Sequence, residues 1–246
     1  MKDHSANTRT APEENHGIPS GLAHFTLIAK GAQLAKAETA DRLKTGSPDL
    51  RLLGICLCAL YQAATCHRGC NKGPHLLEGL SARAYNHACA AFTLLTSGYY
   101  DEALNLVRGI GEIYHLVALS TVDQDAISHW IDSDKPTRMR DFSPSKVRAK
   151  LRRLAPELEL TPSTWYSELS ERYTHVTPAI SPNKHNPERA IAGGIFQESG
   201  LEVSLQELIH ITCGLSLMIC RYFDYADLFE QISGLLLGET EEAPSD

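Results

Sequence analysis

Apolar residues recur every three to four positions along most of the chain, which is the spacing of one face of an α-helix. In the first half this periodicity predicts four long helices, over about 22–43, 50–66, 74–96 and 97–120. Glycine and proline separate them, because both residues interrupt a helical pattern. Since almost every segment has helical rather than alternating spacing, we expect an all-α protein.

Further helix starts are indicated by capping residues. Ser143 and Thr161 each precede a proline, and a polar cap followed by proline at the first helical position is a common start. Ser204 and Glu207 have the Ser-x-x-Glu spacing of a capping box. They predict one long helix over about 205–236, bent near Gly214.

Three segments lack this periodicity. Residues 1–17 and 239–246 are polar and are expected to be disordered tails, the second of them acidic. Residues 176–200 contain prolines and two adjacent glycines, which predict a long loop, and long loops in compact domains are often functional. The expected fold is therefore one helical domain over 18–238, a bundle of six to eight helices with a long Pro/Gly-rich loop.

Gly109 and Gly111 lie inside the fourth predicted helix. Each costs about 1 kcal/mol of helix stability relative to alanine. The pair therefore predicts that another helix approaches too closely for a side chain at these positions.

Composition narrows the possible partners. The 246 residues are 43% hydrophobic and carry a net charge of -7, which disfavours a protein that coats nucleic acid. From Lys135 to Arg153, however, eight basic residues accompany a single acidic one. Arg148 and Arg152 share a helix face there, either as a solvated surface or as contacts for RNA or another anion.

The chain has the features of a cytoplasmic protein. No stretch approaches 18 apolar residues without a charge or histidine, and residues 1–17 contain no apolar signal core, so no membrane association is expected. Seven cysteines, an odd number, favour reduced thiols in a chain large enough to build a core.

The fourth helix also carries a polar stripe. Arg108, Glu112 and His115 are spaced i, i+4 and i+7, which places them on one side of the helix beside its apolar face. An Arg-Glu pair at this spacing forms a salt bridge. Buried charges must be paired or must line a site, so the stripe is either an internal ion pair or part of a binding pocket.

A second polar group follows the segment that begins at Thr161. Its candidate ligand-binding residues are Arg172, Tyr173, His175, Lys184 and His185. His175 either caps a helix end or borders a pocket together with His185. Arg172 and Lys184 would suit an anionic ligand in such a pocket.

The spacing from Arg108 to His115 also matches the Arg, four to six residues, His pattern of HEPN ribonucleases. In a metal-independent RNase of this type, Arg108 would stabilise phosphate charge and His115 or His175 would transfer a proton at the ribose 2′-hydroxyl. The same pattern occurs from Arg68 to His75, within a Gly/Pro-rich loop, so it arises readily by chance.

Four potential zinc ligands fall within ten residues, namely Cys66, His67, Cys70 and His75. Their spacing is not that of a zinc knuckle, and no second CxxC accompanies them. The prediction therefore includes no metal and no cofactor, with a zinc-stabilised scaffold as an alternative.

Several longer motifs resemble a mostly bacterial family of all-helical proteins without a settled activity. They are GYYDEALNLVRGIGEIYHL at 98–116, FSPSKVRAKL at 142–151, YSELSERYTHVTP at 166–178, PNKHNP at 182–187 and GGIFQ at 193–197. The resemblance implies an all-α fold with Arg108, Glu112 and His175 as characteristic polar residues. His115 is outside that pattern. Similar helices occur in proteins of mobile elements and defence islands, which the resemblance implies as a context.

The leading hypothesis is a helical binding or regulatory protein, because no complete catalytic set is present. We expect a homodimer in which Arg108, Glu112, Tyr173, His175 and His185 form a polar pocket for an anionic ligand or partner. The alternatives are the HEPN-type RNase and the zinc scaffold.

Overall fold

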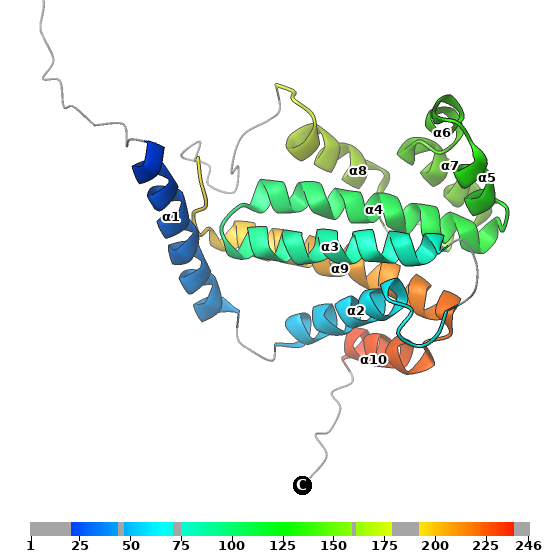
Figure 1. The fold of residues 1–246 in the computed structure, drawn as a ribbon, viewed down its shortest axis with the longest axis horizontal. Coiled ribbons are helices and arrows are strands. Elements are labelled where there is room, and N and C mark those ends of the chain that lie inside the picture. Colours follow the sequence, from blue (N-terminus) through cyan, green and yellow to red (C-terminus); the bar gives the residue numbers. More distant parts are fainter. Residues whose placement is uncertain (1–20, 44–46, 71–74, 159–160, 179–191, 239–246) are drawn as a thin grey trace, which may run out of the picture.

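The computed structural model describes residues 21–43, 47–70, 75–158, 161–178 and 192–238. Within these ranges the chain forms α-helices, one 3-10 turn and one π-helical turn, and no strand, which confirms the all-α prediction (Figure 1). The α-helices are α1 Gly21–Arg42, α2 Pro48–Ala64, α3 Leu76–Thr96, α4 Tyr100–Val122, α5 Ala126–Asp132, α6 Lys135–Asp141, α7 Pro144–Leu154, α8 Ser163–Leu169, α9 Glu198–Phe223 and α10 Ala226–Leu237.

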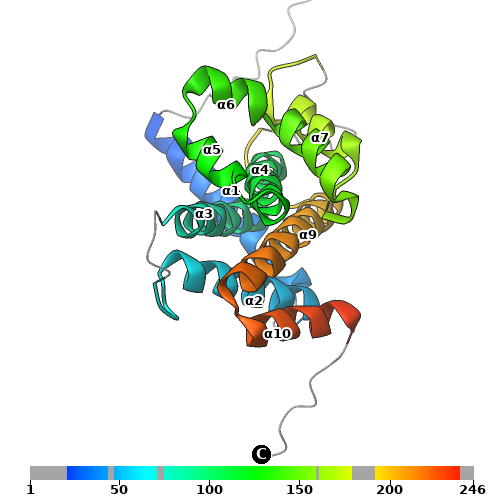
Figure 2. The same cartoon turned by 90° about the vertical axis from the view of Figure 1, so that its right-hand side faces the viewer.

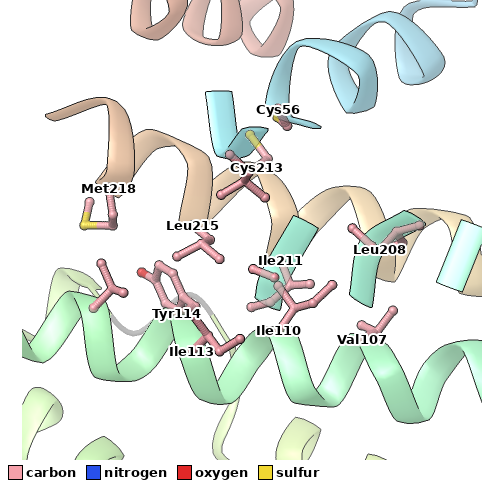
Figure 3. Close-up of a cluster of buried hydrophobic side chains, with 14 of the residues drawn as sticks. Cys56, Val107, Ile110, Ile113, Tyr114, Leu208, Ile211, Cys213, Leu215 and Met218 are labelled. Atoms are coloured by element: carbon pink, nitrogen blue, oxygen red, sulfur yellow. The ribbon is translucent and has the colours of Figure 1, made fainter. Parts of the chain in front are cut away.

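The core lies between the long helices α2, α3, α4 and α9, which run side by side (Figures 1 and 2). Figure 3 shows Val107, Ile110 and Tyr114 of α4 facing Leu208 and other apolar side chains of α9. Fully burying an aliphatic side chain contributes about 1.5–3 kcal/mol, so this row of contacts is the main source of stability. Alanines on α3 are fully buried and allow its backbone to lie close to α4 and α9.

Short helices cover the side of α4 that faces away from α2 and α10 (Figures 1 and 2). The cover, defined as α5–α7, is attached through few apolar side chains. Val147 and Leu151 of α7 are buried, Ala126 is the buried residue of α5, and α6 has none. The 3-10 turn Pro156–Leu158 leads from it to α8, and the π-helical turn Ser170–Thr174 follows α8.

The prediction of six to eight helices was too low, because the described residues contain ten α-helices. The additional helices are α5 and α6, which have only seven residues each, and α10, which was predicted as part of the last helix. The Asp134 side chain caps the start of α6 by accepting a hydrogen bond from the Thr137 N–H.

The prediction for the last helix was wrong in two respects. The helix starts at Glu198, and Ser204 lies inside it, where its hydroxyl donates to the Gly200 carbonyl at 2.6 Å. It ends at Phe223 and is followed by Asp224, which has left-handed backbone dihedrals, so α9 and α10 are separate helices.

The two interior glycines of α4 allow close contacts as predicted, although with side chains of other helices. A Cβ at Gly109 would lie 2.7 Å from His87 Nδ1 of α3. At Gly111 it would lie 2.9 Å from the indole ring of Trp165 of α8. No side chain fits at either position unless its neighbour moves.

The predictions for the long loop, the two tails and a membrane span are tested only in part by the described residues. Residues 175–178 and 192–197 are non-helical, while 179–191, with Lys184 and His185, lie outside the described residues, as do both predicted tails. Among the described helices, α9 is long and apolar enough to span a membrane by length and composition. Of its most apolar 18-residue window, however, 72% is buried inside the protein, as in a core helix.

Candidate functional site

The Arg108 and Glu112 side chains pair, as the i, i+4 spacing predicts. Arg108 Nη2 lies 3.1 Å from Glu112 Oε1, and Arg108 Nε donates to Ser170 Oγ at 2.7 Å. The Tyr166 hydroxyl donates to the same Glu112 oxygen. Ser170 in turn donates to the Tyr166 carbonyl at 2.7 Å. The network thus connects α4 to α8 and to the π-helical turn that follows it.

A second arginine joins this network from the cover. The Arg108 and Arg148 guanidinium carbons lie 4.4 and 4.6 Å from the centroid of the Tyr166 ring. Such cation–π contacts stabilise by about 0.5–2 kcal/mol, depending on desolvation. Burial raises the pKa of Tyr166 above its usual range, and the hydrogen bond to Glu112 is the second largest cause. The phenol therefore stays protonated and acts as a donor at neutral pH.

Glu112 also borders a cavity of about 430 Å³ between α3, α4 and the cover. This inner pocket is lined by Leu80, Arg83, Glu112, Ile113, His115, Leu116, Trp130, Phe142, Pro144 and Val147. Its walls are mainly apolar and aromatic, with three polar side chains. A pocket with apolar walls and a few convergent polar groups is typical of a small-molecule site.

His115 is fully buried in the wall of this pocket, and its ring makes an edge contact with Tyr114. Arg83 is exposed at the surface of α3, four residues before His87. Burial, and then the charge of Arg83, lowers the pKa of His87, so this histidine is neutral at pH 7. Three arginines therefore lie in the neighbourhood of Glu112: Arg108 pairs with it, Arg148 contacts the Tyr166 ring, and Arg83 lines the same pocket.

The outer face of the cover carries a separate basic groove of about 530 Å³, whose lining includes His129, Arg140, Lys146, Lys150 and Arg153. Arg140 pairs with Asp141, and Lys150 with Asp123 at the end of α4. Lys146 and Arg153 are exposed and form no ion pair within the described residues. The predicted basic stretch therefore presents part of its charge to solvent.

The structure separates the predicted site residues into two sets. Arg108, Glu112 and Arg148 come together around Tyr166, and His115 lies on the inner pocket. Arg152 is exposed on α7, outside the residues that line the inner pocket or the basic groove.

The second predicted group lies at the π-helical turn. Arg172 is exposed there, and Tyr173 is half-buried, with a pKa raised to about 12 by burial and by the nearby Asp101 charge. The His175 side chain is exposed, and its backbone N–H caps the turn by donating to the Ser170 carbonyl at 2.8 Å. Within the described residues, that backbone bond to Ser170 connects His175 to the Arg108 network, and no hydrogen bond, ion pair or ring contact of the His175 side chain does so.

Sequence reasoning missed four residues of this site, namely Arg83, Trp130, Tyr166 and Ser170. Ser170 and Tyr166 lie 62 and 54 positions from their partners on α4. No spacing rule connects residues so far apart. The one available signal was the interior glycine at 111, which indicated a bulky neighbour, and that neighbour is Trp165, next to Tyr166.

A separate group of potential metal ligands lies at the end of α2, where Cys66, Cys70 and His75 converge. His67 is exposed and outside this group. Cys56, Cys213 and Cys220 are buried as small apolar residues, whereas Cys58 is exposed.

Comparison of the chain with models of known protein families, with curated proteins and with solved structures gave no match.

Proposed function

We propose that this is a helical binding protein that takes a small anionic molecule with an apolar or aromatic body into the inner pocket. The observation that carries this proposal is the pocket of about 430 Å³ between α3, α4 and the cover. Its volume lies within the range of about 300–1,000 Å³ that is usual for ligand sites.

Charge supports an anionic ligand. Arg83 and Glu112 are the charged residues of the lining, and Arg108 pairs with Glu112. Since Arg108 offsets the Glu112 charge, the Arg83 guanidinium makes the pocket favour an anion. Arg83 is the residue best placed to pair with the ligand, because its charge is exposed whereas Arg108 already bonds Ser170 and Glu112.

The walls support an aromatic or apolar body. Trp130 and Phe142 lie on the pocket from the cover, and Leu80, Ile113 and Leu116 lie on it from α3 and α4. Burial of apolar surface contributes about 25 cal/mol per Å², so such walls favour a ligand with a ring or a branched chain. Since two of these walls belong to short helices, movement of the cover would admit the ligand.

Calorimetric titration with benzoate, phenyl phosphate, benzylamine and inorganic phosphate tests this proposal. We expect the two aromatic anions to bind, the aromatic amine not to bind and phosphate alone to bind more weakly. Arg83→Gln should weaken binding about tenfold or more, since a charged hydrogen bond contributes about 1.5–3 kcal/mol. Lys146→Gln, on the outer groove, is the matched control. Equal affinity for benzylamine and benzoate, or no effect of Val147→Trp in the pocket wall, would contradict it.

A second candidate is the metal-independent RNase, which the outer basic groove favours because Lys146 and Arg153 are available for phosphate contacts. The test is cleavage of labelled RNA without added metal. Arg108→Ala and His175→Ala, each checked by circular dichroism, should lose activity if these residues act in catalysis. Equal cleavage by all three proteins, or none by wild type, would remove this candidate.

The predicted homodimer is supported by the surface of α1. Leu22, Phe25 and Leu34 are 84%, 71% and 57% exposed on this helix, which lies at the edge of the bundle (Figure 1). Exposed apolar side chains on a helix at the edge of a bundle are typical of protein interfaces. Light scattering should give twice the chain mass, and Phe25→Glu should shift the measured mass toward that of the monomer.

A further inference from the structure

The connection from α2 to α3 brings two thiols and one imidazole together. Cys70 Sγ lies 3.5 Å from His75 Nε2, and Cys66 Sγ lies 3.7 Å from His75 Nδ1. One ligand atom from each of the three residues lies within 4.8 Å of the others. This group lies at the other end of α3 from the α3–α4 turn and shares no residue with the inner pocket.

The Cys70–His75 separation is that of two ligands on one zinc ion. Zinc lies about 2.3 Å from sulfur and about 2.0–2.1 Å from nitrogen in tetrahedral sites, which places the sulfur and nitrogen ligands about 3.5 Å apart. Thiolate and imidazole are also the ligands that zinc prefers. The donor set thus suits Zn²⁺, and the Cys66 sulfur is near enough to join an ion held by Cys70 and His75 Nε2 after a small shift from Nδ1.

Arg68, the middle of the three residues between the two cysteines, fixes the segment to the bundle. Arg68 donates from its two terminal nitrogens to both Asp227 oxygens, at 2.5 and 2.8 Å, and its guanidinium lies 4.8 Å from the Tyr225 ring centroid. Cys66 itself has a left-handed backbone, with a φ of 51°. A non-glycine residue in this conformation is strained, and the Arg68 anchor maintains it. The ligands are therefore preorganised.

A carboxylate completes the surroundings of the histidine. With Nε2 of His75 as the ligand, its Nδ1 faces Glu78 Oε1 at 3.5 Å. A carboxylate behind a metal-bound imidazole orients the ring and increases its basicity. His75 and Glu78 also line a cavity of about 780 Å³ that extends to Ser120, Thr121 and Arg221.

We propose that Cys66, Cys70 and His75 bind one Zn²⁺ whose fourth position is open to a small oxygen or nitrogen donor from this cavity. The described residues supply three ligands, and sites with three protein ligands and an exchangeable fourth are those that bind or activate small molecules. The site is independent of the proposed anion pocket.

Metal analysis of the whole chain, purified in reductant and then dialysed against Zn²⁺, tests the ion itself. We expect one tightly bound zinc per chain. Cys66→Ser, Cys70→Ser and His75→Ala should each lose it, while Cys58→Ser, an exposed cysteine on α2, should keep it. Glu78→Gln should weaken affinity by about 10–100-fold. Circular dichroism of each variant separates loss of metal from loss of fold. A reduced, folded wild-type chain that takes up no zinc would overturn the proposal.

Cobalt substitution tests the open position. The Co²⁺ protein should show a thiolate charge-transfer band and tetrahedral visible bands, and added imidazole should shift the visible bands. His67→Ala should leave the charge-transfer band and the visible bands unchanged, because His67 is outside the ligand group. Visible bands that do not respond to imidazole, or loss of metal in His67→Ala, would show a closed four-ligand site and overturn the open position.

Discussion

Helix α4 and the cover lie against each other but are built differently. Thirteen of the 23 residues of α4 are buried, compared with three of the 25 residues of α5–α7. The long helices therefore hold most of the hydrophobic free energy, whereas the cover is a thin layer with a pocket on each side of it. Segments with few buried apolar contacts open at low free energy, and binding elements are often drawn from them.

The largest difference should appear when one fully buried leucine in each region is truncated to alanine. Leu208 of α9 and Leu151 of α7 are both fully buried. We expect Leu208→Ala to lower the free energy of unfolding by about 2–5 kcal/mol. Leu151→Ala should cost less, because the thin layer can relax into the neighbouring cavities. Urea denaturation of both variants measures this, and an equal or larger loss for Leu151→Ala would contradict the distinction.

Two glycines sharpen the comparison at the contact between α4 and α8. Gly111→Ala gains about 1 kcal/mol of helix propensity, but its Cβ would lie 2.9 Å from the Trp165 ring, so we expect a net loss of about 1–2 kcal/mol. Gly54→Ala on α2 is the matched control, because a Cβ there meets nothing within 4 Å. It should stabilise by about 0.5–1 kcal/mol. Thermal denaturation shows whether each variant is more or less stable than wild type. Stabilisation by Gly111→Ala would show that Trp165 moves freely.

The Tyr166 hydroxyl connects α8 to the polar stripe of α4. Tyr166→Phe removes its hydrogen bond to Glu112 and should destabilise by about 1–3 kcal/mol, because the acceptor is charged. Tyr222→Phe, at an exposed tyrosine of α9, should change stability by less than about 0.5 kcal/mol. The difference between the two variants in chemical denaturation measures the bond, and equal values would indicate that it contributes nothing.

The smallest effect is a dependence on pH at the edge of the cover. The hydrogen bond from Lys150, opposed in part by burial, keeps the pKa of Asp123 below its ordinary value. A lowered folded-state pKa means that the pair stabilises above about pH 4, the unfolded value, and that this contribution disappears as the pH falls through the lower folded pKa. Both side chains are partly exposed, so we expect about 0.2–1 kcal/mol.

Asp123→Asn provides the measurement. Its stability should fall below that of wild type at pH 7, and the difference should vanish in acid. A difference that is the same at pH 7 and pH 3 would mean that the Asp123 charge does not stabilise the cover.

The long helices could be predicted from the sequence because a stripe of apolar residues over 17 or more positions is unambiguous. The seven-residue helices α5 and α6 could not, since two turns carry too little periodicity. Ser204 was misinterpreted because a serine inside a helix bonds the carbonyl four residues earlier and resembles a cap in the sequence.

In the candidate site, too, contacts within one helix could be predicted from the sequence and contacts between helices could not. The spacing of Arg108 and Glu112 along one helix predicted their ion pair, and it is present. Their bonds to Ser170 and Tyr166, and the pocket beneath the cover, arise from the packing of separate helices, for which the sequence contains no periodic signal.

Native-state hydrogen exchange of the free protein tests the central claim that a stable bundle supports an independently opening cover. We predict that amides of α5–α7 exchange through openings that cost clearly less than global unfolding, while interior amides of α4 and α9 exchange only at the global free energy. Exchange of α5–α7 at the same free energy as α4 and α9 would contradict the account, because the cover and the bundle would then unfold as one unit.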